Sequence, residues 1–149
     1  MGEGAEKEKI MNLSKKLELN NITFIPQKPK EMMPDFYNIA DICLVPLKDV
    51  DLFETFIPSK IFEIMACEKP IVASLAGETK YILNEAQSAI TVEPENTDQI
   101  AKAILEIKNN PQKAKKMGKN GREFVVENYS RSSLADKYLN VLNQAIEGK

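Results

Sequence analysis

The chain has 149 residues, of which 43% are hydrophobic and 28% are charged, which is typical of a single globular domain. This composition excludes a disordered chain and a disulfide-stabilised scaffold. Lys and Arg number 20, Asp and Glu number 22, and the formal net charge is −2, so no nucleic-acid partner is expected. The sequence contains no His, which excludes catalytic triads and metal sites that use imidazole.

The N-terminal part of the chain alternates helix and strand signals. An apolar stripe among helix-forming residues predicts a helix over residues 5–19. Residues 22–25 predict a short strand that ends at Pro26, and residues 30–40 predict a second helix. The continuous apolar run at residues 42–45 predicts a strand buried on both faces, as in a parallel sheet.

The middle of the chain continues this alternation. We expect a loop over residues 48–56 and then a helix over residues 60–67 with Ser59 as its N-cap. This helix is apolar almost all round, which predicts that it is buried. Residues 70–74 and 89–92 predict two more strands, and residues 78–84 predict a short helix between them.

Three helices are expected in the C-terminal part. Residues 98–108 form a clear amphipathic pattern, and residues 133–146 form another. Between them, a helix over residues 111–128 is expected to be interrupted or split by Gly118 and Gly121.

Alternating helices and strands predict an α/β fold, a Rossmann-like parallel sheet with flanking helices. The Gly2-x-Gly4 turn resembles one that follows a strand, but no strand precedes it in the sequence. Four strands also make a thin sheet for a doubly wound fold. We therefore expect residues 1–149 to be a single truncated domain that lacks its first strand–helix unit.

The segment before residue 60 carries the richest set of groups for ligand chemistry. In open parallel sheets, ligands bind at the carboxyl ends of the strands. Here free backbone N–H groups, the Ser59 hydroxyl and the Lys60 ammonium meet at a helix start, which suits a phosphate. Glu63 follows one turn later on an otherwise apolar helix, where a carboxylate needs a partner. A pair of ligand hydroxyls, a backbone amide or a lysine would each serve.

These residues lie in a block, residues 58–74 (PSKIFEIMACEKPIVAS), that resembles the donor-binding signature of GT-B glycosyltransferases. Within that class it is most similar to glycosyltransferase family 4, also called group 1. The flanking pieces agree in order: residues 2–4 resemble the G-x-G turn, 21–26 the N-V-x-F-x-G strand, 37–46 the Y-x-x-A-D-V-x-V-x-P segment and 92–96 the V-x-P-x-D loop. The resemblance covers nearly the whole chain.

The resemblance implies the C-terminal half of a GT-B enzyme, the domain that binds the nucleotide of a sugar-nucleotide donor. Glu63 matches the second carboxylate of the family's E-x7-E motif, which holds the ribose hydroxyls. Four residues match the segment whose backbone amides face the diphosphate and the donor sugar, although the second of them has no N–H: Ile57, Pro58, Ser59 and Lys60.

Other positions match the family less directly. The first carboxylate of the motif falls on Thr55, so this role belongs either to Thr55 or to Glu54 from a shifted loop. Gln27 matches the position where backbone contacts hold the base. Gly2 and Gly4 match a turn that either binds phosphate or is only structural.

The implied full enzyme transfers a sugar from a UDP- or GDP-sugar to an acceptor with retention of configuration, and an N-terminal domain absent from this chain binds the acceptor. The F-E-T-x-x-P-S-K form resembles enzymes of bacterial surface-polysaccharide assembly. No metal and no cofactor beyond the donor substrate are expected. We expect the isolated chain to be inactive, and the full enzyme to be cytoplasmic or peripheral to the inner face of the membrane.

Two alternatives stay open at the level of sequence. One is a non-catalytic nucleotide-binding module. The other is a different GT-B enzyme such as a sugar-nucleotide 2-epimerase, although the absence of His counts against its acid–base chemistry.

Overall fold

The computed structural model describes residues 3–148, and its contacts divide the chain into two compact units, Met1–Asp35 and Phe36–Lys149. Each unit is described by itself. The first contains helix α1 (Lys7–Lys16) and the short 3-10 helix η1 (Lys30–Met32). Helix α2 (Met33–Ile39) begins in the first unit and ends in the second.

The predicted helix at residues 5–19 is confirmed over the shorter span of α1, but the predicted strand at residues 22–25 is wrong. A β-strand is stable only when a neighbouring strand pairs with its backbone groups. Residues 3–35 contain no other strand that would pair with this segment. Its apolar, β-branched composition therefore does not lead to a strand here.

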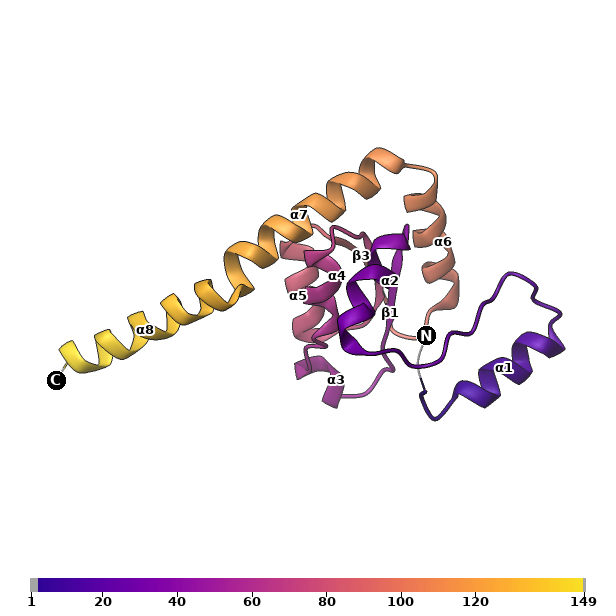
Figure 1. The fold of residues 1–149 in the computed structure, drawn as a ribbon, viewed down its shortest axis with the longest axis horizontal. Helices are drawn as coiled ribbons and strands as arrows, with labels where there is room; N and C mark the ends of the chain where they lie inside the picture. The colour runs from indigo at the N-terminus through magenta and orange to yellow at the C-terminus, as the bar shows by residue number, and fades with distance from the viewer. Residues whose placement is uncertain (1–2, 149) are drawn as a thin grey trace. The chain divides into compact units, whose positions relative to one another are not determined.

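The second unit contains a parallel three-stranded sheet in the order β1 (Cys43–Pro46), β2 (Ile71–Ser74), β3 (Ala89–Val92) (Figure 1). Pro46 pairs with Ser74, and Ser74 pairs with Val92. The carboxyl ends of all three strands therefore lie at one edge of the sheet. This Rossmann-like α/β arrangement confirms the predicted fold class and three of the four predicted strands.

Among the residues that the structure describes, six helices follow β1, and two of them differ from the sequence prediction. The expected loop at residues 48–56 contains a short helix, α3, and the expected interruption at Gly118 and Gly121 is absent from α7. The helices are α3 (Leu52–Thr55), α4 (Lys60–Ala66), α5 (Gly77–Glu85), α6 (Thr97–Lys108), α7 (Pro111–Tyr129) and α8 (Arg131–Glu147).

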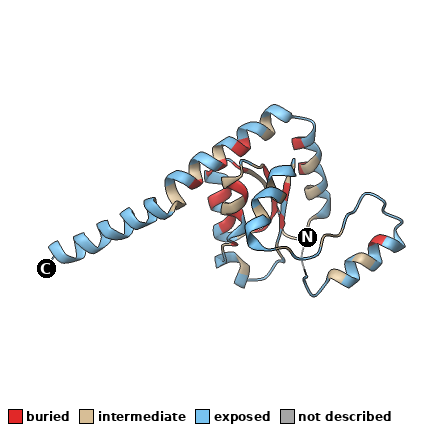
Figure 2. Ribbon diagram, viewed as in Figure 1, coloured by how far each residue is buried: buried red, intermediate tan, exposed pale blue. Residues whose placement is uncertain are grey.

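The core lies on both faces of the sheet, because successive side chains of a strand point to opposite faces. Ile71 and Ala73 pack in a cluster with buried residues of α4 and α5. Val72, between them in the chain, packs with the α6 residues Ala103 and Ile107. Figure 2 shows these buried positions gathered around the strands and the inner sides of the helices.

Helix α7 stays continuous across its glycines because they let it approach neighbouring segments of the fold closely. A Cβ at Gly118 would lie 2.0 Å from the carbonyl oxygen of Glu68, just after α4. A Cβ at Gly121 would lie 2.9 Å from the Cβ of Ser88. The helix start is also well capped, because the Asn110 side chain accepts a hydrogen bond from the Lys113 N–H at 3.0 Å. Packing and capping together outweigh the helix cost of glycine.

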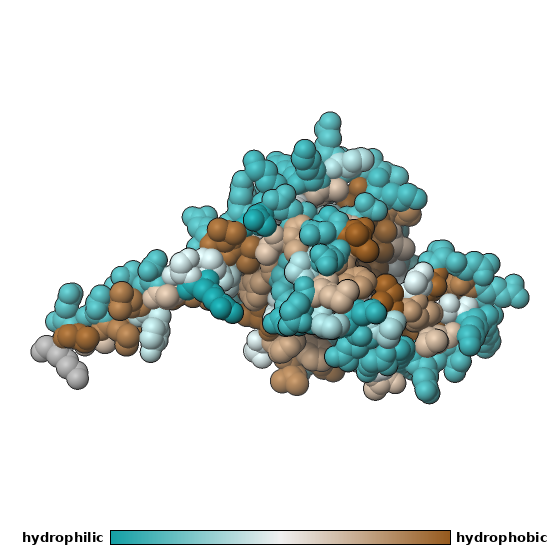
Figure 3. All heavy atoms as spheres, viewed as in Figure 1, coloured by the Kyte–Doolittle hydropathy of each residue, from teal (hydrophilic) through white to brown (hydrophobic). Residues whose placement is uncertain are grey.

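Helix α8 carries no buried residue. Its exposed apolar side chains are visible along the helix in Figure 3, and include Leu134, Leu139, Val141, Leu142 and Ile146. Within residues 3–148, no helix combines the length and the apolar character that crossing a membrane requires.

We predict that Gly118→Ala lowers the free energy of unfolding by about 2 kcal/mol, although alanine favours an isolated helix by about 1 kcal/mol over glycine. The added methyl group meets the Glu68 carbonyl, which is backbone and cannot rotate away. Urea unfolding followed by circular dichroism measures the change. Lys116→Ala, at an exposed position of the same helix, is the control and should leave stability nearly unchanged. A stabilised Gly118→Ala variant would contradict the close approach of α7 to Glu68.

Candidate functional site

Glu63 is a half-buried carboxylate on α4, a helix whose residues Ile61, Ile64 and Met65 are buried in the core. These apolar residues take the core-facing side of the helix and leave Glu63 at its margin. The hydroxyl of Tyr37 donates a hydrogen bond to Glu63 Oε2 at 3.3 Å. The Glu63 N–H donates to the Ser59 carbonyl at 3.4 Å, so the carboxylate lies one helical turn from the start of α4.

Tyr37 reaches Glu63 from α2, and the end of α2 is tied to the chain that follows α4. The Lys69 ammonium donates a hydrogen bond to the Asn38 carbonyl at 2.8 Å. Burial and then the negative charge of Glu63 raise the pKa of Tyr37 to about 12. The phenol is therefore protonated at neutral pH and is able to donate to the carboxylate.

The segment that leads into α4 presents unused backbone donors. The N–H groups of Ile57, Ser59 and Lys60 make no hydrogen bond with any residue that the structure describes. Ser59 occupies the predicted N-cap position, but its side chain accepts no capping hydrogen bond. Lys60 is exposed, and within residues 3–148 its ammonium forms no ion pair. These groups together suit an anion.

Two residues at the start of α5 hold this segment in place. The hydroxyl of the buried Thr79 donates to the Phe56 carbonyl at 2.9 Å. Gly77 has a φ of +69°, and a Cβ there would lie 2.0 Å from the Glu54 carbonyl oxygen. Only glycine allows both the positive φ and this close approach. The segment is thus held by the hydrogen bond to the Phe56 carbonyl and packs closely against Gly77 at Glu54, and the N–H groups of Ile57, Ser59 and Lys60 stay available.

The structure brings together most of the predicted site residues. Glu54 and Thr55 are exposed on α3, and the Thr55 hydroxyl lies 3.5 Å from the Leu52 carbonyl, so neither side chain is committed to a strong contact. The other members lie on α4 or directly before it: Ile57, Pro58, Ser59, Lys60 and Glu63.

The remaining predicted site residues lie in the first unit or outside the residues that the structure describes. Gly2 lies outside the described residues, and Gln27 is exposed in the first unit. Gly4 lies in a turn whose carbonyl accepts from the Lys7 N–H at 3.0 Å. The Lys7 ammonium is bound to the Glu3 carboxylate and lowers the pKa of that group. Because this lysine already has an anionic partner, it favours the structural interpretation of the turn over phosphate binding.

Sequence reasoning missed three residues that shape the site: Tyr37, Gly77 and Thr79. Tyr37 belongs to the Y-x-x-A-D segment, on which part of the family resemblance rests. That motif could have identified Tyr37 as a candidate site residue. Nothing local marks Thr79, because its partner Phe56 lies 23 residues earlier in the chain.

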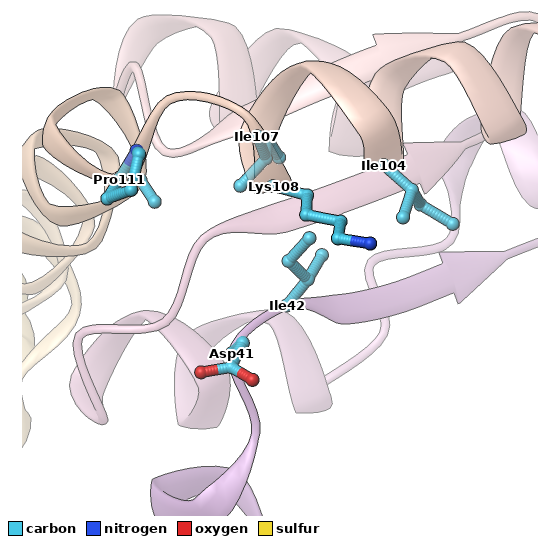
Figure 4. Close-up of a pocket in the computed structure, with 7 residues that line it drawn as sticks. Asp41, Ile42, Ile104, Ile107, Lys108 and Pro111 are labelled. Atoms are coloured by element: carbon cyan, nitrogen blue, oxygen red, sulfur yellow. The ribbon is translucent and has the colours of Figure 1, made fainter.

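A separate groove of about 720 Å³ opens beside β1 and α6 and shares no residue with the Glu63 site. Figure 4 shows Ile42 and Ile104 pointing into it, with Lys108 beside them and Asp41 at its margin. Its lining is largely apolar and offers no cluster of donors for a diphosphate. Within residues 3–148, no group of three or more Cys, Asp or Glu side chains is arranged to hold a metal ion.

Comparison with known families identifies the family of the chain. The family described as glycosyl transferases group 1 matches residues 1–124, which is most of the chain. The chain belongs to the group 1 glycosyl transferases. This confirms the family that the motifs around Glu63 indicate.

Known group 1 proteins and GT-B structures resemble this chain along most of its length. Poly(ribitol-phosphate) alpha-N-acetylglucosaminyltransferase from Staphylococcus aureus is 28% identical over 95% of the chain. A sucrose-phosphate synthase structure from Thermosynechococcus elongatus is 28% identical over 98% of the chain, with a TM-score of 0.80. The structure of Anabaena Alr3699/HepE in complex with UDP-glucose covers 95% with a TM-score of 0.78, and its 17% identity shows the fold alone.

The group 1 chain covers only part of each of these proteins. It spans 28% of the staphylococcal enzyme, 36% of the synthase chain and 38% of the Anabaena chain. The chain therefore corresponds to about a third of the length of each of these proteins.

We predict that Tyr37 makes the stability of this group 1 chain fall as pH rises from 10.0, its ordinary pKa, to about 12, its pKa in the fold. In that window the unfolded phenol ionises before the folded one, so the unfolded state binds fewer protons and is favoured. Below pH 10.0 the contribution of Tyr37 to the free energy of unfolding is fully present. Urea unfolding at intervals across the window measures this slope, and Tyr37→Phe should reduce it.

Tyr81→Phe is the control for this prediction, because Tyr81 is 63% exposed. Its slope should equal that of the wild type. Equal slopes for the wild type and Tyr37→Phe would show that the Glu63 environment does not act on the phenol.

Proposed function

We propose that the segment from Glu54 to Glu63 binds the nucleoside diphosphate part of a sugar donor, and that the full protein transfers the sugar to an acceptor. The observation that carries this proposal is one arrangement: the Glu63 carboxylate lies one helical turn from the start of α4, and three backbone N–H groups at or just before that start have no partner among the described residues. Such a site offers acceptors for hydroxyl groups at one end and donors for an anion at the other.

Glu63 is the group proposed to bind the ribose. A carboxylate has about four acceptor positions, and the Tyr37 hydroxyl uses one of them. The remaining positions suffice for the two adjacent hydroxyls of a ribose. One turn of helix, about 5.4 Å, separates this carboxylate from the start of α4, which leaves room for a sugar ring between hydroxyls and phosphate.

The diphosphate is proposed to meet the N–H groups of Ile57, Ser59 and Lys60, with the Lys60 ammonium beside them. Pro58 contributes no N–H and is buried, so it fixes the backbone between the donors. These groups would offset the negative charge that develops on the leaving diphosphate during transfer. The proposed contribution of this chain to catalysis is thus positioning and charge stabilisation.

The comparisons support a transferase over a non-catalytic module or an epimerase. The staphylococcal relative is named as an alpha-N-acetylglucosaminyltransferase of poly(ribitol phosphate), which supports transfer of a sugar to a polymeric acceptor. Retention of configuration and a role in surface-polysaccharide assembly are proposed from the motif resemblance alone. The Anabaena structure holds UDP-glucose, which supports a nucleotide-sugar donor. We further propose an acceptor-binding domain elsewhere in the full protein, and a cytoplasmic or peripheral membrane location for it. Gln27 and Gly4 remain predictions.

We predict that the chain binds UDP or GDP at millimolar concentration or better, and that Glu63→Ala weakens this binding at least about tenfold. A hydrogen bond to a charged group contributes about 1.5–3 kcal/mol, and about 1.4 kcal/mol corresponds to tenfold. Isothermal titration calorimetry with UDP and GDP measures the affinities.

Glu127→Ala is the matched control, since Glu127 is an exposed residue of α7 outside the site. Its affinity should equal that of the wild type. The proposal is wrong if neither nucleotide binds at millimolar concentration, or if Glu63→Ala and Glu127→Ala bind equally well.

A further inference from the structure

We propose that Tyr37 is a positioning residue for Glu63, whose carboxylate it holds in the orientation that receives the ribose hydroxyls. This inference rests on the proposed function and adds a second residue to the ribose site. Its basis is the hydrogen bond between the Tyr37 hydroxyl and Glu63 Oε2.

Tyr37 is the only donor to the Glu63 carboxylate among the described residues. A glutamate side chain loses rotamer entropy when it is fixed. Without the phenol, binding of a ligand would have to supply that ordering. With it, part of the ordering is complete before the ligand arrives, which is the physical meaning of preorganisation.

The phenol comes from a part of the fold that is itself held in place. Tyr37 is half-buried and packs against the main core cluster. Its carbonyl accepts from the Ala40 N–H at 3.1 Å, and the next carbonyl along, that of Asn38, accepts from Lys69 at 2.8 Å. Movement of the hydroxyl away from Glu63 would therefore disturb the end of α2 and its link to Lys69.

A neutral phenol suits this task better than a cation would. A lysine or arginine at this position would neutralise the carboxylate and weaken it as an acceptor for hydroxyl groups. The phenol orients one oxygen and leaves the negative charge available to the ligand. Its O–O distance of 3.3 Å exceeds the usual range for such bonds, which leaves room for the bond to shorten when a ligand binds.

The test compares binding of UDP, or GDP if that is the nucleotide the wild type binds, with binding of its 2′,3′-dideoxy analogue. Wild type should prefer the nucleotide that has both hydroxyls. Tyr37→Phe should weaken binding of that nucleotide about threefold to tenfold, the effect of one hydrogen bond. Its affinity for the dideoxy analogue should change less than twofold, because that ligand does not use Glu63. A purely structural role would weaken both ligands equally.

Tyr129→Phe is the matched control. Tyr129 is also half-buried beside the same core cluster, and its hydroxyl donates no hydrogen bond to a described residue. This variant should keep both affinities of the wild type.

The outcomes distinguish failure of the positioning role from failure of the proposed function. If the wild type prefers the ribonucleotide and Tyr37→Phe keeps that preference undiminished, the positioning role is overturned while the proposed function stands. If both ligands weaken equally, the residue is structural and the positioning role is again overturned. If the wild type binds neither ligand, or both equally, the proposed function fails and the positioning role fails with it.

A spectroscopic measurement on the wild-type chain covers the case in which Tyr37→Phe does not fold. With tyrosine labelled at Cζ by carbon-13, the Tyr37 resonance should shift when the ribonucleotide binds, because its hydrogen bond to Glu63 tightens. The Tyr129 resonance should stay in place. An unmoved Tyr37 resonance at saturating ribonucleotide would overturn the proposal.

Discussion

Parallel pairing of β1 with β2 is the constraint on which the candidate site depends. The register aligns Pro46 with Ser74, so the chain leaves both strands at the same edge of the sheet. The segment that leaves β1 leads to Glu63, and the segment that leaves β2 begins α5. Gly77 and Thr79 at the start of α5 then hold the backbone at Glu54 and Phe56. Without the aligned exits, these contacts would not form.

The same constraint explains why the carbonyl and N–H groups of the segment before α4 have different roles. Carbonyl groups before α4 are used for fixing the segment, and the N–H groups that follow have no partner among the described residues. Ser59 and Lys60 are exposed, so water can solvate their N–H groups until a ligand takes its place. The half-buried Glu63 carboxylate, one turn into α4, keeps acceptor positions beyond the one that Tyr37 uses. One ligand that carries an anion and a pair of hydroxyl groups would bind to both sets of groups.

The sequence allowed the parallel α/β fold to be predicted, because it depends on local patterns, whereas the roles of the site residues rest on the family resemblance and stay predictions. A continuous apolar run indicates a buried parallel strand, and one acid on an apolar helix indicates a partner for Glu63. The contact with Tyr37 joins residues 26 positions apart, and it depends on how α2 and α4 pack. Such packing leaves little trace in the spacing of residues.

The two predictions that the structure contradicts, the strand at residues 22–25 and the interrupted helix, also depend on contacts between segments far apart in the chain. Residues 22–25 have the composition of a strand, but a strand requires a partner that composition does not reveal. Gly118 and Gly121 predict an interruption of a helix, because the local cost of glycine is visible in the sequence. The close approach to Glu68 that makes glycine necessary there is visible only in the fold.

The most direct test of the central claim is to map nucleotide binding residue by residue on the nitrogen-15-labelled chain. On titration with UDP or GDP, we expect the largest amide shifts to fall on Ile57, Ser59, Lys60 and Glu63. Residues of the apolar groove, such as Lys108 and Ala114, should shift little. Shifts centred on that groove, or no shifts at millimolar nucleotide, would contradict the assignment of the donor site to α4 and the segment before it.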